Sequence, residues 1–324
     1  MLPEAVIFIL LFINLTVSEV ILTKPEDIHS KDLPEHIALG MMFINMRKEP
    51  TISRKFKEDI DMMMESMLSW SSGTPLHFIV ITDGRSVRGH FLSNLTFHFF
   101  YFILFTEAEK VLRDTISKCV SLGVIRKRRT KRKYRIPNVK MTFVDIKDIT
   151  EGNEEFINAM KSNTDKGILS SEFNEKYFHD LFYLGPVYHN KFINLEKFIF
   201  LDVDLVFQTD IKKLENQFSK FDLPGGSCIG VGPDLSPHYL HKLKEFRKEN
   251  PGTVFGDPGR FQGFNTGVTL YHLECLRNNA VYNEYLQPEN VRFYVKHFHS
   301  SDHSDSYLKL PFRFRLLSEN STLK

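Results

Sequence analysis

An uninterrupted apolar run followed by two spaced aspartates constrains this chain more than any other feature. Residues Lys197–Phe207 read KFIFLDVDLVF, and Phe198–Leu201 has the pattern of a strand buried on both faces, as in a parallel sheet. Asp202 and Asp204 follow, and in an extended chain their side chains would point to the same side. Two neighbouring carboxylates repel each other and are costly beside an apolar strand, so a divalent cation is the simplest compensation. Oxygen ligands of this kind favour Mg²⁺ or Mn²⁺.

A spaced aspartate pair is by itself a weak signal, because such pairs are also common in solvated turns. The apolar lead-in favours the metal site here, since open α/β sheets bind ligands at the carboxyl ends of their strands.

Alternating strand and helix patterns predict the sheet around this pair. The segment Ile37–Asn45 has the pattern of a buried strand, and Ser53–Leu68 has apolar residues, several of them Met, at helical spacing. A second strand, Leu76–Thr82, completes a βαβ unit, and Val139–Ile146 is a third strand. The sequence therefore predicts an α/β fold with a mostly parallel central sheet flanked by helices.

Further elements are expected on both sides of the Asp pair. Helices are expected at about Thr106–Ser121, Glu175–Leu184 and His241–Glu249, and a strand and turn at Ser227–Asp234. The motif GFNTG, Gly263–Gly267, reads as a turn before a strand Val268–Tyr271. Its small residues would let the backbone approach a ligand closely, with an amide and a hydroxyl available for hydrogen bonds.

The first 22 residues predict export. An apolar core runs from Ala5 to Ile13, which is shorter than the roughly 20 residues of a membrane span. It fits a signal peptide or a short membrane anchor, while a buried N-terminal strand is the alternative. Residues 23–36 are polar and read as a linker. In an exported chain, Asn94 and Asn320 would become glycan acceptors.

Charge and cysteine content exclude some classes of protein. The formal net charge of +2 gives no reason to expect nucleic-acid binding by the chain as a whole, and the basic run Arg126–Arg135 reads as a solvated loop. A nucleic-acid patch on that run is the remote alternative. Cys119, Cys228 and Cys275 have no zinc spacing and allow one disulfide at most.

Four motifs together resemble the family 8 retaining glycosyltransferases of the GT-A fold, and within them the xyloside α-1,3-xylosyltransferase branch. They are LGMMFIN at Leu39–Asn45, FIFLDVDLVFQTDIKKL at Phe198–Leu214, FRKENPGTVFGDPG at Phe246–Gly259, and QGFNTGVTLYHLECLRN at Gln262–Asn278. The resemblance covers about residues 37–90 and 138–295. The last two motifs, in this order after the Asp pair, are specific.

The resemblance implies a role for each matched residue. Asp202 and Asp204 would hold Mn²⁺, which bridges the diphosphate of a UDP-sugar, and Val203 would touch the nucleotide sugar. The end of the first strand would hold uridine, through Met42, Phe43 and Ile44. The loop around the donor sugar and the acceptor would consist of Gly263, Phe264, Asn265, Thr266 and Gly267. Asn265 and Thr266 would position the substrates, and no protein nucleophile is assigned.

The implied reaction is transfer of xylose from UDP-xylose, in α-1,3 linkage, to a xylosyl-glucose O-glycan on EGF-like repeats. The implied location is the lumen of the endoplasmic reticulum or Golgi, with single-pass type II anchoring if the N-terminal segment is retained. Another family 8 transferase that uses a UDP-hexose, or a catalytically inactive or truncated sugar-binding paralogue, are the alternatives.

Two parts of the chain depart from the family pattern. The GT-A domain is expected at 37–310, with an atypical insertion at about 88–135 and a tail at 311–324. The family's C-terminal motifs, which would supply the third metal ligand, are absent in the expected form. Asp305, His297, His299 and His303 are the residues that the region offers instead.

Overall fold

The computed structural model describes eleven segments of the chain. They are residues 23–43, 50–71, 73–82, 111–118, 138–161, 183–221, 227–233, 244–249, 251–252, 264–297 and 314–316. The N-terminal apolar segment, most of the expected insertion, the glycan acceptors Asn94 and Asn320, Cys119 and the basic run lie outside these residues.

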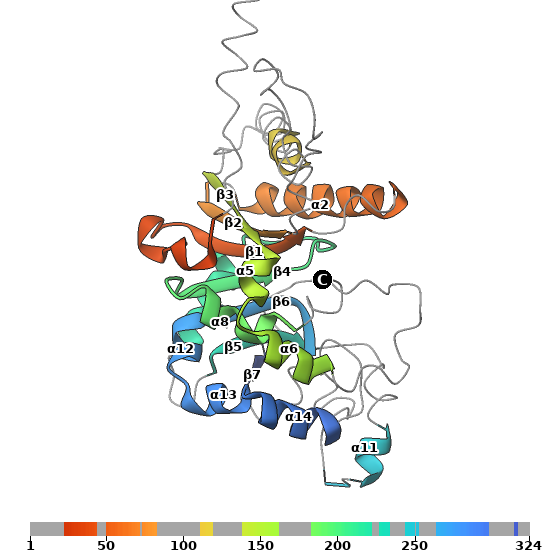
Figure 1. The fold of residues 1–324 in the computed structure, drawn as a ribbon. Helices are drawn as coiled ribbons and strands as arrows, with labels where there is room; N and C mark the ends of the chain where they lie inside the picture. The colour runs from red at the N-terminus through yellow and green to blue at the C-terminus, as the bar shows by residue number, and fades with distance from the viewer. Residues whose placement is uncertain are drawn as a thin grey trace, which may run out of the picture.

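A seven-stranded sheet with strand order β3-β2-β1-β4-β6-β5-β7 organises the fold (Figure 1). The strands are β1 (Ile37–Phe43), β2 (Leu76–Thr82), β3 (Val139–Asp145), β4 (Lys197–Leu201), β5 (Ile229–Pro233), β6 (Phe264–His272) and β7 (Phe314–Leu316). Strands β1 to β4 are mutually parallel, and β6 runs antiparallel to both β4 and β5. The mostly parallel α/β sheet predicted from the sequence is therefore confirmed.

This topology brings several chain segments to one edge of the sheet. Because β6 is antiparallel to β4 and β5, its amino end lies at the edge where β1, β4 and β5 have their carboxyl ends. The Asp pair follows β4, and the motif Phe264–Gly267 begins β6. Segments more than 60 residues apart in sequence thus meet at the edge where such sheets bind ligands.

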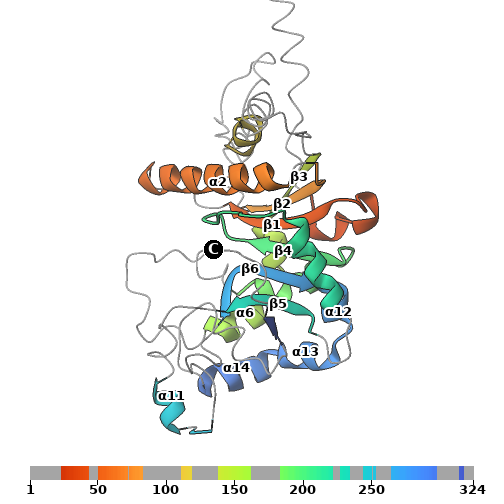
Figure 2. The ribbon, with the colours of Figure 1, turned by 180° about the vertical axis from the view of Figure 1, so that it is seen from behind.

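One face of the sheet is covered by α2 (Pro50–Trp70), which is longer than the predicted helix at both ends. Alternate residues of β1, namely Leu39, Met41 and Phe43, belong to the core on this side. Met63, Met64 and Met67 of α2 are fully buried in the same core, so the predicted Met-rich stripe is a packing surface. In both views α2 lies toward the β2 and β3 end of the sheet (Figures 1 and 2).

The other core is built on aromatic rings. Phe198 of β4 packs against Tyr188, Phe192 and Tyr271, with ring centroids 5.2 to 6.4 Å apart. Short helices supply much of this layer: α5 (Ile146–Thr150), α6 (Glu154–Lys161), α8 (Tyr188–Lys191), α12 (Leu273–Arg277), α13 (Ala280–Tyr285) and α14 (Pro288–His297). Helix α14 packs against α6, and both α13 and α14 lie toward the β7 end of the sheet (Figure 2).

The remaining short elements are η1 (Pro25–Asp27), η2 (Ser30–Asp32), η4 (Gly185–Val187), α9 (Lys212–Glu215), η5 (Asn216–Lys220) and α11 (Lys244–Glu249). The expected linker at 23–36 contains η1 and η2 and packs on the domain. Ile28 is 4% exposed, and Ser30 exchanges hydrogen bonds with the segment before β4, its amide donating to the Asn194 carbonyl. A tertiary partner therefore orders a stretch whose composition alone is polar.

Cys228 and Cys275 form a disulfide that joins the segment before β5 to α12. This agrees with the limit of one bridge that three cysteines impose. Among the described residues, no helix combines the length and apolar character that crossing a bilayer requires.

Candidate functional site

The Asp pair lies in a turn directly after β4. The amide of Asp202 donates to the carbonyl of Gly267 at 2.8 Å, which extends the β4–β6 pairing by one residue. Val203 and Asp204 then form a turn. The extended geometry expected across both aspartates therefore ends at the first of them, because the β4 ladder stops at Leu201.

A bulge in β6 shapes the opposite side of the site. Thr269 pairs with Val231 of β5 and Asn265 pairs with the next β5 residue, Gly232, so residues 266–268 of β6 have no partner on β5. The GFNTG motif, expected as a turn, is thus bulged strand from Phe264 onward. The Asn265 side chain stabilises the bulge, because its Oδ1 accepts a hydrogen bond from the Gly267 amide at 3.0 Å.

Gly267 makes room for two of the predicted ligand groups. A Cβ at this position would lie 3.1 Å from Asp202 Oδ2 and 3.1 Å from Asn265 Oδ1, which is tighter than ordinary carbon–oxygen contact. Asp202, Asn265 and Gly267, which the sequence assigned to one site from two distant motifs, are therefore brought together. Glycine keeps this side of the Asp202 carboxylate open.

The electrostatics of the pair disfavour two ionised carboxylates side by side. The pKa of Asp202 is raised to about 6, first by desolvation among surrounding protein atoms and second by the negative charge of Asp204. Both residues are exposed by surface area, so water reaches the carboxylates and screening limits the size of this rise. The direction of the shift means that the negative charge of Asp202 lacks full compensation from the described protein groups.

The residues predicted to contact the nucleotide sugar differ in how far they are buried. The Phe43 side chain is fully buried and packs edge-to-face on Phe56, with ring centroids 5.1 Å apart, and Phe264 is 2% exposed. The side chains of these two residues are therefore packed in the core and leave almost no surface for a ligand. Met42 and Val203 are half-buried, and Thr266 is half-buried in the bulge. Ile44 and Gly263 lie outside the described residues.

Two carboxylates are the metal ligands that the described chain offers at this edge. Within the described segments, no group of three or more His, Cys, Asp or Glu side chains could hold a metal ion. His297 ends α14, whereas His299, His303 and Asp305 lie outside the described residues. The donor set fits a hard divalent cation such as Mg²⁺ or Mn²⁺, whose other positions water and phosphate oxygens usually fill.

A pocket of about 550 Å³ lies elsewhere, on α2. Its lining residues are Glu58, Asp61, Met62, Glu65, Ser66, Ser69, Trp70 and Lys118. It contains none of the predicted site residues, and Lys118 and Asp61 within it already form an ion pair at 3.0 Å. We therefore place the candidate site at the Asp pair and not at this pocket.

Sequence reasoning missed the residues that hold the segment after the Asp pair. Ser66 and Ser71, from α2 and the residue after it, accept hydrogen bonds from backbone amides of that segment. Their partners are 141 and 140 residues away in sequence, so no local pattern could have revealed them.

Comparison with known families decides the class of protein. A family model for glycosyl transferase family 8 matches residues 76–299, more than half of the chain. The chain belongs to glycosyl transferase family 8. The matched region includes the Asp pair and the β6 motif.

Similar proteins agree with this assignment. Human Xyloside xylosyltransferase 1 is 32% identical over 167 residues, which is 51% of this chain and 41% of the human protein. The mouse protein of that name is 32% identical over 168 residues, with the same shares covered. These matches span about two fifths of the length of those relatives.

The fold also matches a solved structure. The crystal structure of mouse Xyloside xylosyltransferase 1 in its apo form superposes with a TM-score of 0.60 at 22% identity, covering 87% of this chain and 85% of that one. The predicted GT-A fold is confirmed.

Proposed function

We propose that this family 8 member is an Mn²⁺-dependent retaining glycosyltransferase that transfers xylose from UDP-xylose. The proposed product is an α-1,3 linkage to a xylosyl-glucose O-glycan on EGF-like repeats, formed in the lumen of the endoplasmic reticulum or Golgi. The observation that carries the proposal is the convergence of Asp202 with Asn265 and Gly267 at the carboxyl edge of the sheet. The names of the human and mouse relatives support xylose as the sugar.

Asp202 and Asp204 would hold the metal ion. When bound, a divalent cation neutralises the charge that develops on the diphosphate as UDP leaves. Desolvation first and the charge of Asp204 second raise the pKa of Asp202, and a bound cation would relieve the repulsion between the two carboxylates. The missing side chain at Gly267 leaves one side of Asp202 open to donor oxygens.

The β6 bulge would orient the substrates. Asn265 Oδ1 accepts from the Gly267 amide, which sets the plane of the side-chain amide and leaves Nδ2 as a donor for a ligand oxygen. Thr266 supplies a hydroxyl next to it. No protein nucleophile is assigned, so the work of these residues is orientation and electrostatics, in line with a front-face retaining reaction.

Calorimetric titration with UDP tests the metal and the nucleotide together. Wild-type protein should bind UDP in the presence of MnCl₂ and lose this binding in EDTA, and Asp204→Asn should abolish the metal-dependent part. Asp32→Asn, an exposed carboxylate in η2, is the matched control and should bind as wild type. Metal-independent binding that Asp204→Asn leaves unchanged would contradict the proposal.

A panel of donors tests the sugar. Hydrolysis and transfer are measured with UDP-xylose, UDP-glucose and UDP-galactose, using a xylosyl-glucosyl EGF repeat as the acceptor. We expect turnover with UDP-xylose. Preference for a UDP-hexose would instead assign the chain to another activity of the same family.

One observation favours a second candidate, an inactive sugar-binding paralogue. The described segments supply two carboxylates and no third metal ligand. Such a protein would bind UDP with Mn²⁺ but would show no turnover with any donor in the panel.

A further inference from the structure

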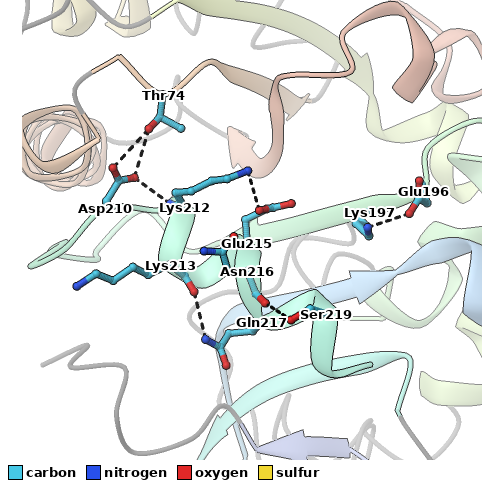
Figure 3. A network of polar contacts seen from close by, with 10 residues as sticks. All are labelled: Thr74, Glu196, Lys197, Asp210, Lys212, Lys213, Glu215, Asn216, Gln217 and Ser219. Atoms are coloured by element: carbon cyan, nitrogen blue, oxygen red, sulfur yellow. Dashed lines mark hydrogen bonds and ion pairs between the residues drawn. The ribbon is translucent and has the colours of Figure 1, made fainter. Parts of the chain in front are cut away.

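The segment that follows the Asp pair is attached to α2 and the turn after it by three hydroxyl side chains. The Phe207 amide donates to Ser66 Oγ at 2.9 Å, and the Ile211 amide donates to Ser71 Oγ at 3.0 Å. Thr74 Oγ1 donates to the Asp210 carboxylate, at 3.4 and 3.5 Å from its two oxygens (Figure 3).

Backbone pairing does not hold this segment within the described part of the chain. The last ladder-type bond is from the Asp202 amide to the Gly267 carbonyl, and the next backbone bond is local, from Lys213 to Asp210. Among the described residues, the backbone of residues 203–206, between Asp202 and the Phe207 amide, makes no backbone-to-backbone hydrogen bond. Asp204 therefore lies between two anchors, the β6 backbone on one side and Ser66 on the other.

Ser66 is oriented for this contact. Its hydroxyl donates to the Met63 carbonyl at 2.8 Å within α2, which directs its lone pairs away from the helix axis toward the Phe207 amide. The Phe207 side chain is 3% exposed and belongs to the core under α2. Removing the Ser66 hydroxyl would leave the amide without this acceptor at the margin of a core, which is costly.

We propose that Ser66 is a positioning residue for the Asp pair: through the Phe207 amide it fixes the direction of the turn that carries Asp204. This inference rests on the proposed function, because it assigns Ser66 to the same metal site. It predicts that Ser66 affects metal-dependent nucleotide binding although it touches neither metal nor nucleotide.

The test compares Ser66→Ala with Ser66→Thr, which retains a hydroxyl, and with the control Ser219→Ala. The Ser219 hydroxyl is exposed and donates to the Asn216 carbonyl within η5 (Figure 3). UDP affinity is measured by calorimetry at saturating MnCl₂, well below the melting temperature of every variant. Hydrogen exchange of the peptide covering residues 202–210 is measured separately without metal.

For Ser66→Ala we expect UDP affinity to fall about three- to tenfold, the loss that corresponds to about one hydrogen bond. In the metal-free protein, the peptide covering residues 202–210 should exchange its amide hydrogens faster in Ser66→Ala than in wild type. Ser66→Thr should restore most of the UDP affinity and of the protection from exchange, and Ser219→Ala should match wild type in both measurements. Affinity equal to wild type together with a lower melting temperature would overturn the inference, because Ser66 would then be a structural anchor only.

Two further outcomes are distinguishable. Wild-type protein that fails to bind UDP with MnCl₂ would contradict the proposed function, whereas normal wild-type binding with unaffected Ser66→Ala would contradict this inference alone. If Ser66→Ala does not fold, Thr74→Val loosens the same segment at a half-buried position. It should weaken UDP affinity about twofold, as expected for a longer, weaker hydrogen bond, and unchanged affinity would overturn the inference.

Discussion

Replacing Gly40 by Ala should destabilise the sheet in a predictable way. Gly40 is buried in β1, where it pairs with Ile79 of β2 on one side and with Phe200 of β4 on the other. A Cβ at this position would enter the ring of Phe198, closer than real Cβ atoms approach other atoms. Because β1 is hydrogen-bonded on both sides, its backbone has little freedom to move away.

The Phe198 ring also has little freedom to move. It is fully buried, and its centroid lies 5.6 Å from that of Tyr188, 5.2 Å from Phe192 and 6.4 Å from Tyr271. Overpacking a core in this way costs about 1–3 kcal/mol of unfolding free energy. Ala gives the unfolded chain less conformational entropy than Gly does, and this difference offsets about 0.4–1 kcal/mol of the loss. The midpoints of these two ranges give a net loss of about 1.3 kcal/mol, or about 3–5 °C in melting temperature at about 2–4 °C per kcal/mol for a large domain.

Thermal unfolding followed by circular dichroism measures this loss, and Gly232→Ala is the matched control. A Cβ at Gly232 would meet its nearest atoms, of Asn265, only at 4.0 Å, so the melting temperature should stay close to that of wild type. Phe198→Leu should lower the free energy of unfolding less in the Gly40→Ala protein than in the wild type, because the smaller side chain relieves the clash. The packing argument is refuted if Gly40→Ala has the same melting temperature as Gly232→Ala. It is also refuted if the losses of stability from Gly40→Ala and Phe198→Leu are additive in the double variant.

Three other perturbations follow from the structure. Burial, and then the positive charges around it, lower the pKa of His77 to about 4 from 6.5, so the folded state binds its proton less tightly. The contribution of His77 to stability should be full above pH 6.5, and the free energy of unfolding should fall by up to about 3 kcal/mol toward pH 4. Urea titrations at several pH values should show a weaker pH dependence for His77→Gln than for wild type. An equal pH dependence would contradict the role of His77. Gly267→Ala should weaken Mn²⁺-dependent UDP binding about tenfold at nearly unchanged melting temperature, because its Cβ crowds Asp202 Oδ2 at 3.1 Å; wild-type affinity would count against the site. Cys228 and Cys275 are 47 residues apart, and reducing their disulfide should lower the free energy of unfolding by about 4 kcal/mol in the chain-entropy picture. Urea unfolding with and without reductant measures this loss, and an unchanged midpoint would argue against it.

The local elements of the fold could be predicted where the pattern itself carries the physics. Strand β2 was predicted at Leu76–Thr82 and has these bounds, because all seven residues are buried and the short apolar run Phe78–Ile81 suits a strand covered on both faces. Helix α2 was predicted from its apolar spacing, and that face is the one that packs on the sheet. The position of the Asp pair after a buried strand was likewise visible from neighbouring residues alone.

Contacts between distant segments could not be predicted in the same way. The sequence assigned Asp202 and Gly267 to one site only through family resemblance, and the antiparallel entry of β6 beside β4 is what brings them together. The helices α12 to α14 and the ordered segment around Ile28 were missed, because these elements are too short to show a clear apolar period and gain their burial from partners far away in sequence.

By itself, then, the sequence determined the parallel strands, the packing face of α2 and the aspartates at a strand end, since burial and side-chain periodicity act over a few neighbouring residues. Only the tertiary structure decided that Phe43 and Phe264 turn into the core, that Gly267 leaves Asp202 open, and that Ser66 holds the segment beyond Asp204. These outcomes depend on strand order and register, which are set by the packing of the whole domain.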